Sequence, residues 1–314
     1  PATDFIHDGY IEGKSAGAVT FNLQQILSPL DTNIIRADIT TGPYQLQPTP
    51  NNFNTRSNRP SLWQYRPKPA SVSVGNVNPD STFKRISQIV VDGSSSASDA
   101  ETVVLHPDLL ANLGELSMAA SDGITIASDV TMPGGAQLSL MAPSIQLNNK
   151  ITIPTGSIDL ATLDPSDDVA NIVTTIDIYG DIDLSGLELN TTTSLSQVHY
   201  LDGGELSLSN IGTTTLASST KVDLSAGISA ILNSSGSYEY TLGSAGGVEF
   251  DIDNTGGAGT SDFVLQEQFE AYAASVFGQA SNGGSFSLAI DDSICVSSTE
   301  CGFVESVTPS NYAQ

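Results

Sequence analysis

A run of evenly spaced apolar pairs between residues 116 and 160 limits what this chain can fold into. Each pair reads apolar–x–apolar, the pattern of a short strand that buries one face, because side chains alternate across a strand. The leading pairs begin at Leu116, Leu138 and Ile158, which are 22 and 20 residues apart, and two further pairs lie within each interval. Three short strands in every repeat of about twenty residues are typical of a parallel β-helix (solenoid), in which each coil stacks on the one before. The pairs are Leu116/Met118, Ile124/Ile126, Val130/Met132, Leu138/Leu140, Ile145/Leu147, Ile151/Ile153 and Ile158/Leu160.

The charge balance restricts the partners that the chain can take. It has 35 acidic and 10 basic side chains among 314 residues, a formal net charge of −25. Phosphate backbones and anionic lipid surfaces are bound by clustered Lys and Arg, which this composition does not favour. We therefore exclude nucleic acid as a partner. Charged residues are only 14% of the chain, below the about 25% of ordinary domains, and uncharged polar residues replace them, as in many secreted β-rich proteins.

Periodicity and proline content divide the chain into four parts. Residues 1–42 are predicted to form the first coils, residues 71–261 the main β-helix, and residues 262–314 a terminal region. Residues 43–70 contain six prolines, which cannot lie in central strands, so we predict a side excursion from the stack. The candidate ligand-binding residues in this excursion are Arg56, Arg59, Trp63 and Tyr65.

Residues 262–278 change from strand to helical spacing. Asp262 and Gly278 are residue types that commonly begin and end helices. We expect one short helix here, near the C-terminus, that covers the last coil, because an open strand edge invites aggregation. A helix packed against one side of the stack is the alternative. The apolar positions of the helical pattern are Leu265, Phe269, Tyr272 and Val276.

The titratable residues do not form a recognisable catalytic pattern. His7, His106 and His199 lie in different parts of the chain, without the spacing of metal ligands. Some β-helix proteins are polysaccharide lyases or hydrolases that use clustered carboxylates. Here Asp183 and Asp253 follow apolar strand positions, so their side chains are expected to face solvent. We therefore predict no catalytic residues and keep a polysaccharide-active enzyme as an alternative.

No cofactor is predicted either. Residues 246–253 partly resemble glycine- and aspartate-rich calcium loops, but they lack the nonapeptide repeat, so Ca²⁺ is an alternative and not an expectation. The two cysteines, Cys295 and Cys301, lie close together in the terminal region. A disulfide between them would imply an oxidising compartment, and two free thiols are the alternative.

Five short segments, taken together and in order, resemble a known family over residues 9–227. The family is that of the large filamentous-haemagglutinin-type exoproteins of Gram-negative bacteria. The matching segments are Tyr10–Gly17, Ala142–Leu147, Gly156–Leu160, Gly180–Gly186 and His199–Gly204.

The resemblance implies a right-handed β-helix that is exported by two-partner secretion and acts at the cell surface or in the medium. It implies an interior or C-terminal part of such an exoprotein, because the expected secretion-signal domain is missing. It also implies that Asn51–Trp63 corresponds to an insertion that contains arginine in relatives. The cysteine pair is similar to a C-terminal disulfide that tethers some of these adhesins to their outer-membrane secretion partner.

Three functions follow from these expectations. The first is an adhesin or biofilm protein that binds a glycan, a host cell or a neighbouring cell through its flat faces and loops. The second is a subunit that associates with itself end to end into an extracellular fibre. The third is the β-helix enzyme already described.

Overall fold

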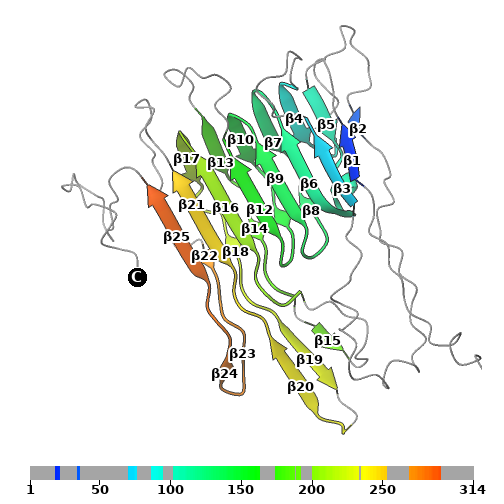
Figure 1. The fold of residues 1–314 in the computed structure, drawn as a ribbon, viewed down its shortest axis with the longest axis vertical. Coiled ribbons are helices and arrows are strands. Elements are labelled where there is room, and N and C mark those ends of the chain that lie inside the picture. The colour runs from blue at the N-terminus through cyan, green and yellow to red at the C-terminus, as the bar shows by residue number, and fades with distance from the viewer. Residues whose placement is uncertain are drawn as a thin grey trace, which may run out of the picture.

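The computed structural model describes residues 18–21, 34–35, 70–75, 86–94, 102–162, 174–187, 189–191, 200–232, 235–252 and 269–290. Almost every element in these ranges is a β-strand, and the large sheets are parallel (Figure 1). The expectation of an all-β fold is therefore confirmed.

Three parallel sheets, which we call sheets 1, 2 and 3, contain most of the strands. Sheet 1 has the order β1 (Ala18–Phe21), β3 (Ala70–Val74), β6 (Leu113–Ala119), β9 (Gln137–Met141), β12 (Ser157–Ala161), β16 (Glu205–Asn210), β21 (Gly247–Ile252) and β25 (Ser285–Ile290). Sheet 2 has the order β17 (Thr213–Leu216), β13 (Thr175–Ile178), β10 (Ser144–Leu147), β7 (Gly123–Ile126), β4 (Gln88–Val91), β5 (Thr102–Leu105) and β2 (Ile34–Ile35). Sheet 3 has the order β22 (Phe269–Glu270), β18 (Val222–Asp223), β14 (Ile182–Asp183), β11 (Ile151–Thr152) and β8 (Val130–Thr131).

In the middle of the chain, the strands enter these sheets in rotation. β6, β7 and β8 lie in sheets 1, 2 and 3, and the next two sets of three strands repeat that order. We call each set of three a rung. Leu138 is aligned with Leu116 on one neighbouring strand and with Ile158 on the other. The intervals of 22 and 20 residues therefore return the chain to the same position in sheet 1, one strand further along, as the sequence predicted.

The core lies between the three sheets. Leu116, Leu138 and Ile158 are each at most 1% exposed, and they belong to one apolar cluster that includes side chains of all three sheets. Neighbouring strands lie about 4.8 Å apart, so aligned apolar side chains touch along the stack. One rung cannot bury its apolar face alone, and the stack is stable only because each rung covers the next.

The helix that the structure describes lies early in the chain, at α1 (Pro107–Leu110). His106 is its N-cap, and its Nδ1 accepts a hydrogen bond from the Asp108 N–H at 3.3 Å. Leu109 and Leu110 are buried, and α1 packs against β8, the terminal strand of sheet 3.

The prediction of a helix over residues 262–278 is wrong for residues 269–278, the part of this segment that the structure describes. Phe269 lies on β22 and pairs in parallel with Val222 of β18, and the backbone N–H of Leu224 donates to the carbonyl of Glu270. An extended segment can hydrogen-bond to the unpaired backbone groups at the open edge of sheet 3. A helix cannot, because its backbone groups are already paired with one another. Tyr272, on the apolar side of the proposed helix, is exposed instead.

A buried polar cluster fixes one corner between sheets 1 and 2. The Asn210 side chain is 1% exposed, and its Oδ1 accepts from Thr162 Oγ1 at 2.8 Å and Thr174 Oγ1 at 2.9 Å. Its Nδ2 donates to Thr214 Oγ1 at 2.9 Å and to the Thr213 carbonyl at 2.8 Å. Because every polar atom of the amide is bonded, its burial is tolerated at this corner.

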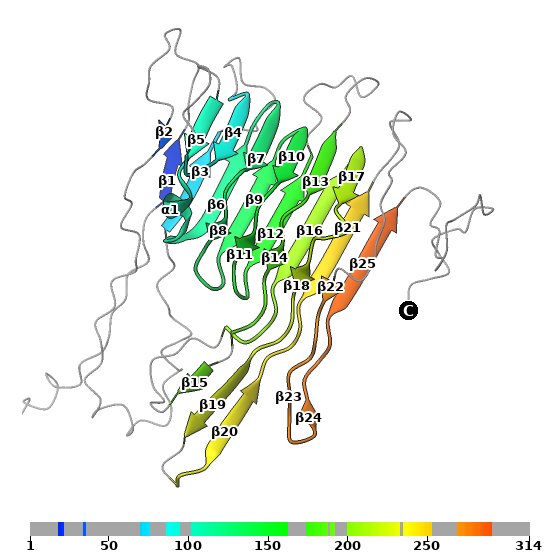
Figure 2. The ribbon, with the colours of Figure 1, turned by 180° about the vertical axis from the view of Figure 1, so that it is seen from behind.

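Two small sheets extend beyond the stack on the same side (Figures 1 and 2). One contains β15 (Leu189–Thr191), β19 (Ile228–Leu232) and β20 (Tyr238–Leu242), and the other is the hairpin of β23 (Ser275–Val276) and β24 (Gln279–Ala280). Close backbone packing joins the extension to the stack. At Gly203, for example, an added Cβ would overlap the carbonyl oxygen of Leu224.

Candidate binding surface

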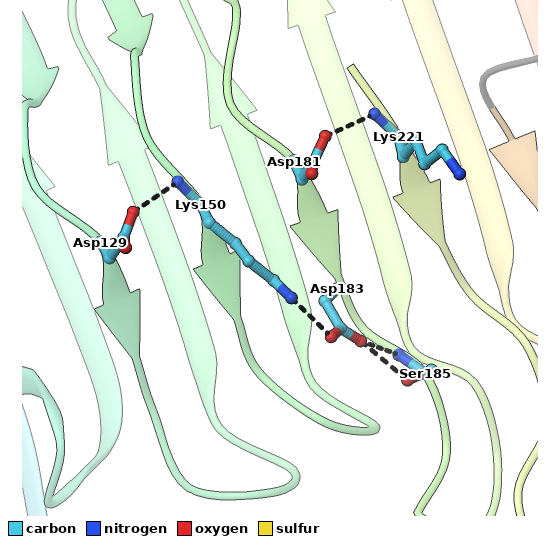
Figure 3. Close-up of polar contacts among 6 residues, drawn as sticks. All are labelled: Asp129, Lys150, Asp181, Asp183, Ser185 and Lys221. Atoms are coloured by element: carbon cyan, nitrogen blue, oxygen red, sulfur yellow. Dashed lines mark hydrogen bonds and ion pairs between the residues drawn. The ribbon is translucent and has the colours of Figure 1, made fainter. Parts of the chain in front are cut away.

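A row of charges of alternating sign crosses sheet 3 at the N-terminal ends of its strands (Figure 3). The residue just before each strand is acidic, basic, acidic and basic in β8, β11, β14 and β18, and these strands are aligned in register. We call this row the charge ladder. Its members are Asp129, Lys150, Asp181 and Lys221.

The contacts of the charge ladder repeat every two rungs. The backbone N–H of Lys150 donates to Asp129 Oδ1 at 3.1 Å, and that of Lys221 donates to Asp181 Oδ1 at 2.9 Å. Lys150 Nζ then lies 3.2 Å from Asp183 Oδ2, on the next rung. In the same way, Lys221 Nζ lies 3.8 Å from a carboxylate oxygen of Glu270.

These contacts make the charge ladder a structural feature. Opposite charges on adjacent rungs attract, whereas like charges at the same spacing would repel. The Asp183 carboxylate also accepts from Ser185 Oγ at 2.7 Å, so its oxygens have partners on two sides. Asp183 and Lys150 are 29% and 50% exposed, and a pair this accessible contributes under about 1 kcal/mol. The alternating order of the charges is therefore compatible with this register but adds little to stability.

The residues proposed from sequence fall largely outside the described ranges. This holds for the cysteine pair, for Asp253 and for the excursion residues Arg56, Arg59, Trp63 and Tyr65. Within the described ranges, no three His, Cys, Asp or Glu side chains are grouped so that they could hold a metal ion. Over the same ranges, no helix has the length and apolar character needed to cross a membrane.

Sequence reasoning missed a group of exposed aromatic side chains on the extension. Tyr238 and Tyr240 of β20 are 49% and 39% exposed, and Phe277, in the turn between β23 and β24, is 89% exposed. The ring centroids of Tyr238 and Tyr240 are 6.2 Å apart, and those of Tyr240 and Phe277 are 5.6 Å apart. We call these three residues the aromatic platform. Two tyrosines two positions apart occur only here in the sequence, which was the available signal.

The turn that carries Phe277 is tight. Val276 pairs with Gln279, so only two residues connect the strands, and both have positive φ: +49° at Phe277 and +80° at Gly278. Such turns favour Asn-Gly, because asparagine and glycine tolerate this conformation. A bulky residue with positive φ is uncommon and costs about 1–2 kcal/mol. The position that is strained is thus also the most exposed aromatic of the extension.

The described residues therefore present a charge ladder whose lysines pair with carboxylates of neighbouring strands, and an aromatic platform that faces solvent. Comparison with protein-family models, curated proteins and solved structures finds no match for this chain.

Proposed function

We propose that this chain is a right-handed parallel β-helix from a secreted Gram-negative exoprotein of the filamentous-haemagglutinin type. In this proposal it acts at the cell surface in adhesion, biofilm cohesion or surface structure, without catalysis. The observation that carries the proposal is the rotation of the chain through three parallel sheets, with Leu116, Leu138 and Ile158 aligned. Connections between parallel strands of one sheet are right-handed in nearly all proteins, which supports the handedness.

The outer surface of the stack suits the presentation of binding groups to a ligand or to another cell. The outward positions of sheet 1 are mostly small and polar, with Ser117 and Ser139 aligned on neighbouring strands. A rigid stack with such faces tolerates inserted loops at its corners and carries binding groups away from its axis. The aromatic platform is one such group, and the excursion with Arg56, Arg59, Trp63 and Tyr65 remains a second candidate.

Two measurements test this proposal. Antibodies raised against the chain should label intact, unpermeabilised cells of the source organism or detect the protein in the culture medium. The purified chain should also bind saturably to biofilm-forming Gram-negative cells, and an unrelated β-protein of similar net charge serves as the control. Labelling only after permeabilisation, together with binding no stronger than the control, would contradict the proposal.

One observation favours the second function, end-to-end association. β25 is the end strand of sheet 1 among the described residues, and Phe286 on it is 49% exposed. The Phe286 ring lies 5.9 Å from that of Phe250 and 5.8 Å from that of Phe269, so a column of aromatic side chains continues to this end. Electron microscopy and light scattering over a range of concentrations test it. Rods that lengthen with concentration, and shorten in Phe286→Ser, would support a fibre, whereas a constant monomer mass would exclude it.

A further inference from the structure

The aromatic platform has no role in the core that would explain it. Phe277 is 89% exposed, and the apolar core cluster includes none of the three rings. Exposed large apolar side chains that lie together mark interaction sites more often than single ones do. The chain also accepts a strained backbone at Phe277, although asparagine would fit the turn better. Both observations indicate that the ring is retained for contact with a ligand.

We propose that the aromatic platform binds an uncharged polysaccharide, with sugar rings stacked on Tyr238 and Tyr240 and packed against Phe277. The inference deepens the proposed function, on which it rests, by naming the ligand class for an adhesin. A sugar ring presents an apolar face of C–H groups and a rim of hydroxyls. Aromatic faces can pack against the C–H groups, and the tyrosine hydroxyls can hydrogen-bond to the sugar hydroxyls. The Tyr238 and Tyr240 rings are inclined by 37° and their centroids are 6.2 Å apart, a separation comparable to the length of one hexose unit, so two neighbouring sugars can meet these two rings. The Phe277 ring is roughly perpendicular to that of Tyr240, at 76° and 5.6 Å, and forms a side wall next to it.

The charges of the described residues disfavour an anionic glycan. Lys150 and Lys221 are the lysine or arginine side chains within these residues, and both pair with carboxylates of sheet 3. The residue between the two platform tyrosines is Glu239, which is exposed on the opposite face of β20 and adds negative charge close to the site. With a net charge of −25, the chain adds no attraction for such groups.

The size of the aromatic platform disfavours a folded protein as the partner. Three aromatic side chains supply about 450–750 Å² even if they are covered completely. A stable protein–protein interface buries about 1,200–2,000 Å² in total. A short stretch of an extended sugar chain needs no more contact area than the aromatic platform offers.

The test uses the whole chain and two single variants. Phe277→Asn removes the ring but suits the turn, so we expect thermal stability to be maintained or raised while polysaccharide binding weakens about tenfold. Tyr179→Ala removes another tyrosine, 49% exposed and located at the end of β13, and should leave binding unchanged. Affinity electrophoresis measures binding in gels that contain a β-glucan, a xyloglucan, an α-glucan, alginate or chitosan.

We expect retardation of the unaltered chain by at least one of the uncharged polymers, at low and high salt alike. The inference is overturned if none of them retards the chain, if Phe277→Asn binds as well as the unaltered chain, or if only chitosan binds and salt abolishes it. Its failure is separable from failure of the proposed function. Surface labelling and cell binding without retardation by any uncharged polymer would refute the inference alone, whereas glycan binding without surface labelling would refute the surface role alone.

Discussion

Replacing a leucine in the middle of the stack should cost far more than replacing one at its end. Leu138 is 1% exposed and lies between Leu116 and Ile158 on the adjacent strands. Leucine-to-alanine changes in cores cost about 2–5 kcal/mol, and the cost rises with the size of the cavity left behind. The backbone hydrogen bonds on both sides of β9 hold its neighbours apart, so the cavity cannot collapse. We therefore expect Leu138→Ala to lower the free energy of unfolding by about 4 kcal/mol.

Two matched variants make this expectation refutable. Leu288 on β25 has one aligned partner, Phe250, and is only half-buried, so Leu288→Ala should cost about 1 kcal/mol. Ser139 is next to Leu138 but faces outward, and Ser139→Ala should stay within about 0.5 kcal/mol. Urea unfolding followed by far-ultraviolet circular dichroism measures all three. The reasoning fails if Leu288→Ala costs as much as Leu138→Ala, or if Leu138→Ala costs no more than Ser139→Ala.

Three further substitutions test separate parts of the structure. Asn210→Ala should cost about 2–4 kcal/mol in thermal or urea unfolding, because it leaves the buried hydroxyl of Thr174 and the partly buried hydroxyl of Thr162 without their acceptor. A cost under about 0.5 kcal/mol would show that the corner does not need the amide. Lys150→Glu should destabilise by about 1–2 kcal/mol at low salt by placing like charges on adjacent rungs, and high salt should remove most of this loss; a loss independent of salt would contradict the electrostatic explanation. Gly203→Val should increase protease cleavage within the extension, because the added side chain would displace the carbonyl of Leu224; an unchanged cleavage pattern would argue against the tight backbone packing.

The sequence predicts the stack best where the corners are short. Between residues 116 and 160 each rung returns after 20 or 22 residues, so the period is visible and its register is correct. Beyond residue 160 the same reasoning misleads. Ile182 and Leu206 are 24 residues apart, close to one period, yet they lie in different sheets, where Ile182 aligns with Val222 and Leu206 with Ile158. The strands of the extension lengthen these repeats, and residue spacing alone does not show where the chain leaves the stack to form the extension.

The candidate binding surface could be predicted only in part. In sequence, Tyr238 and Tyr240 have the alternation of any strand with one buried face. Their exposure follows from the position of β20 beyond the stack, which no local pattern encodes. The helical spacing around Phe269 is misleading because the conformation there also depends on the tertiary environment. The open edge of sheet 3 pairs with this segment as a strand. Local propensity is weaker than an unsatisfied row of backbone hydrogen-bonding groups.

Distances between spin labels along one face of sheet 1 test the central claim, that the rungs stack in register, most directly. With the two native cysteines replaced by serine, one label is placed at Ser73 and the second at Ser207, Glu249 or Ser287, which lie four, five and six strands away in the same aligned row. At about 4.8 Å per strand, the mean distances should be about 19, 24 and 29 Å. Distances that do not increase by this constant step would show that the strands are not stacked in this order, and the fold and the proposed function would both be wrong.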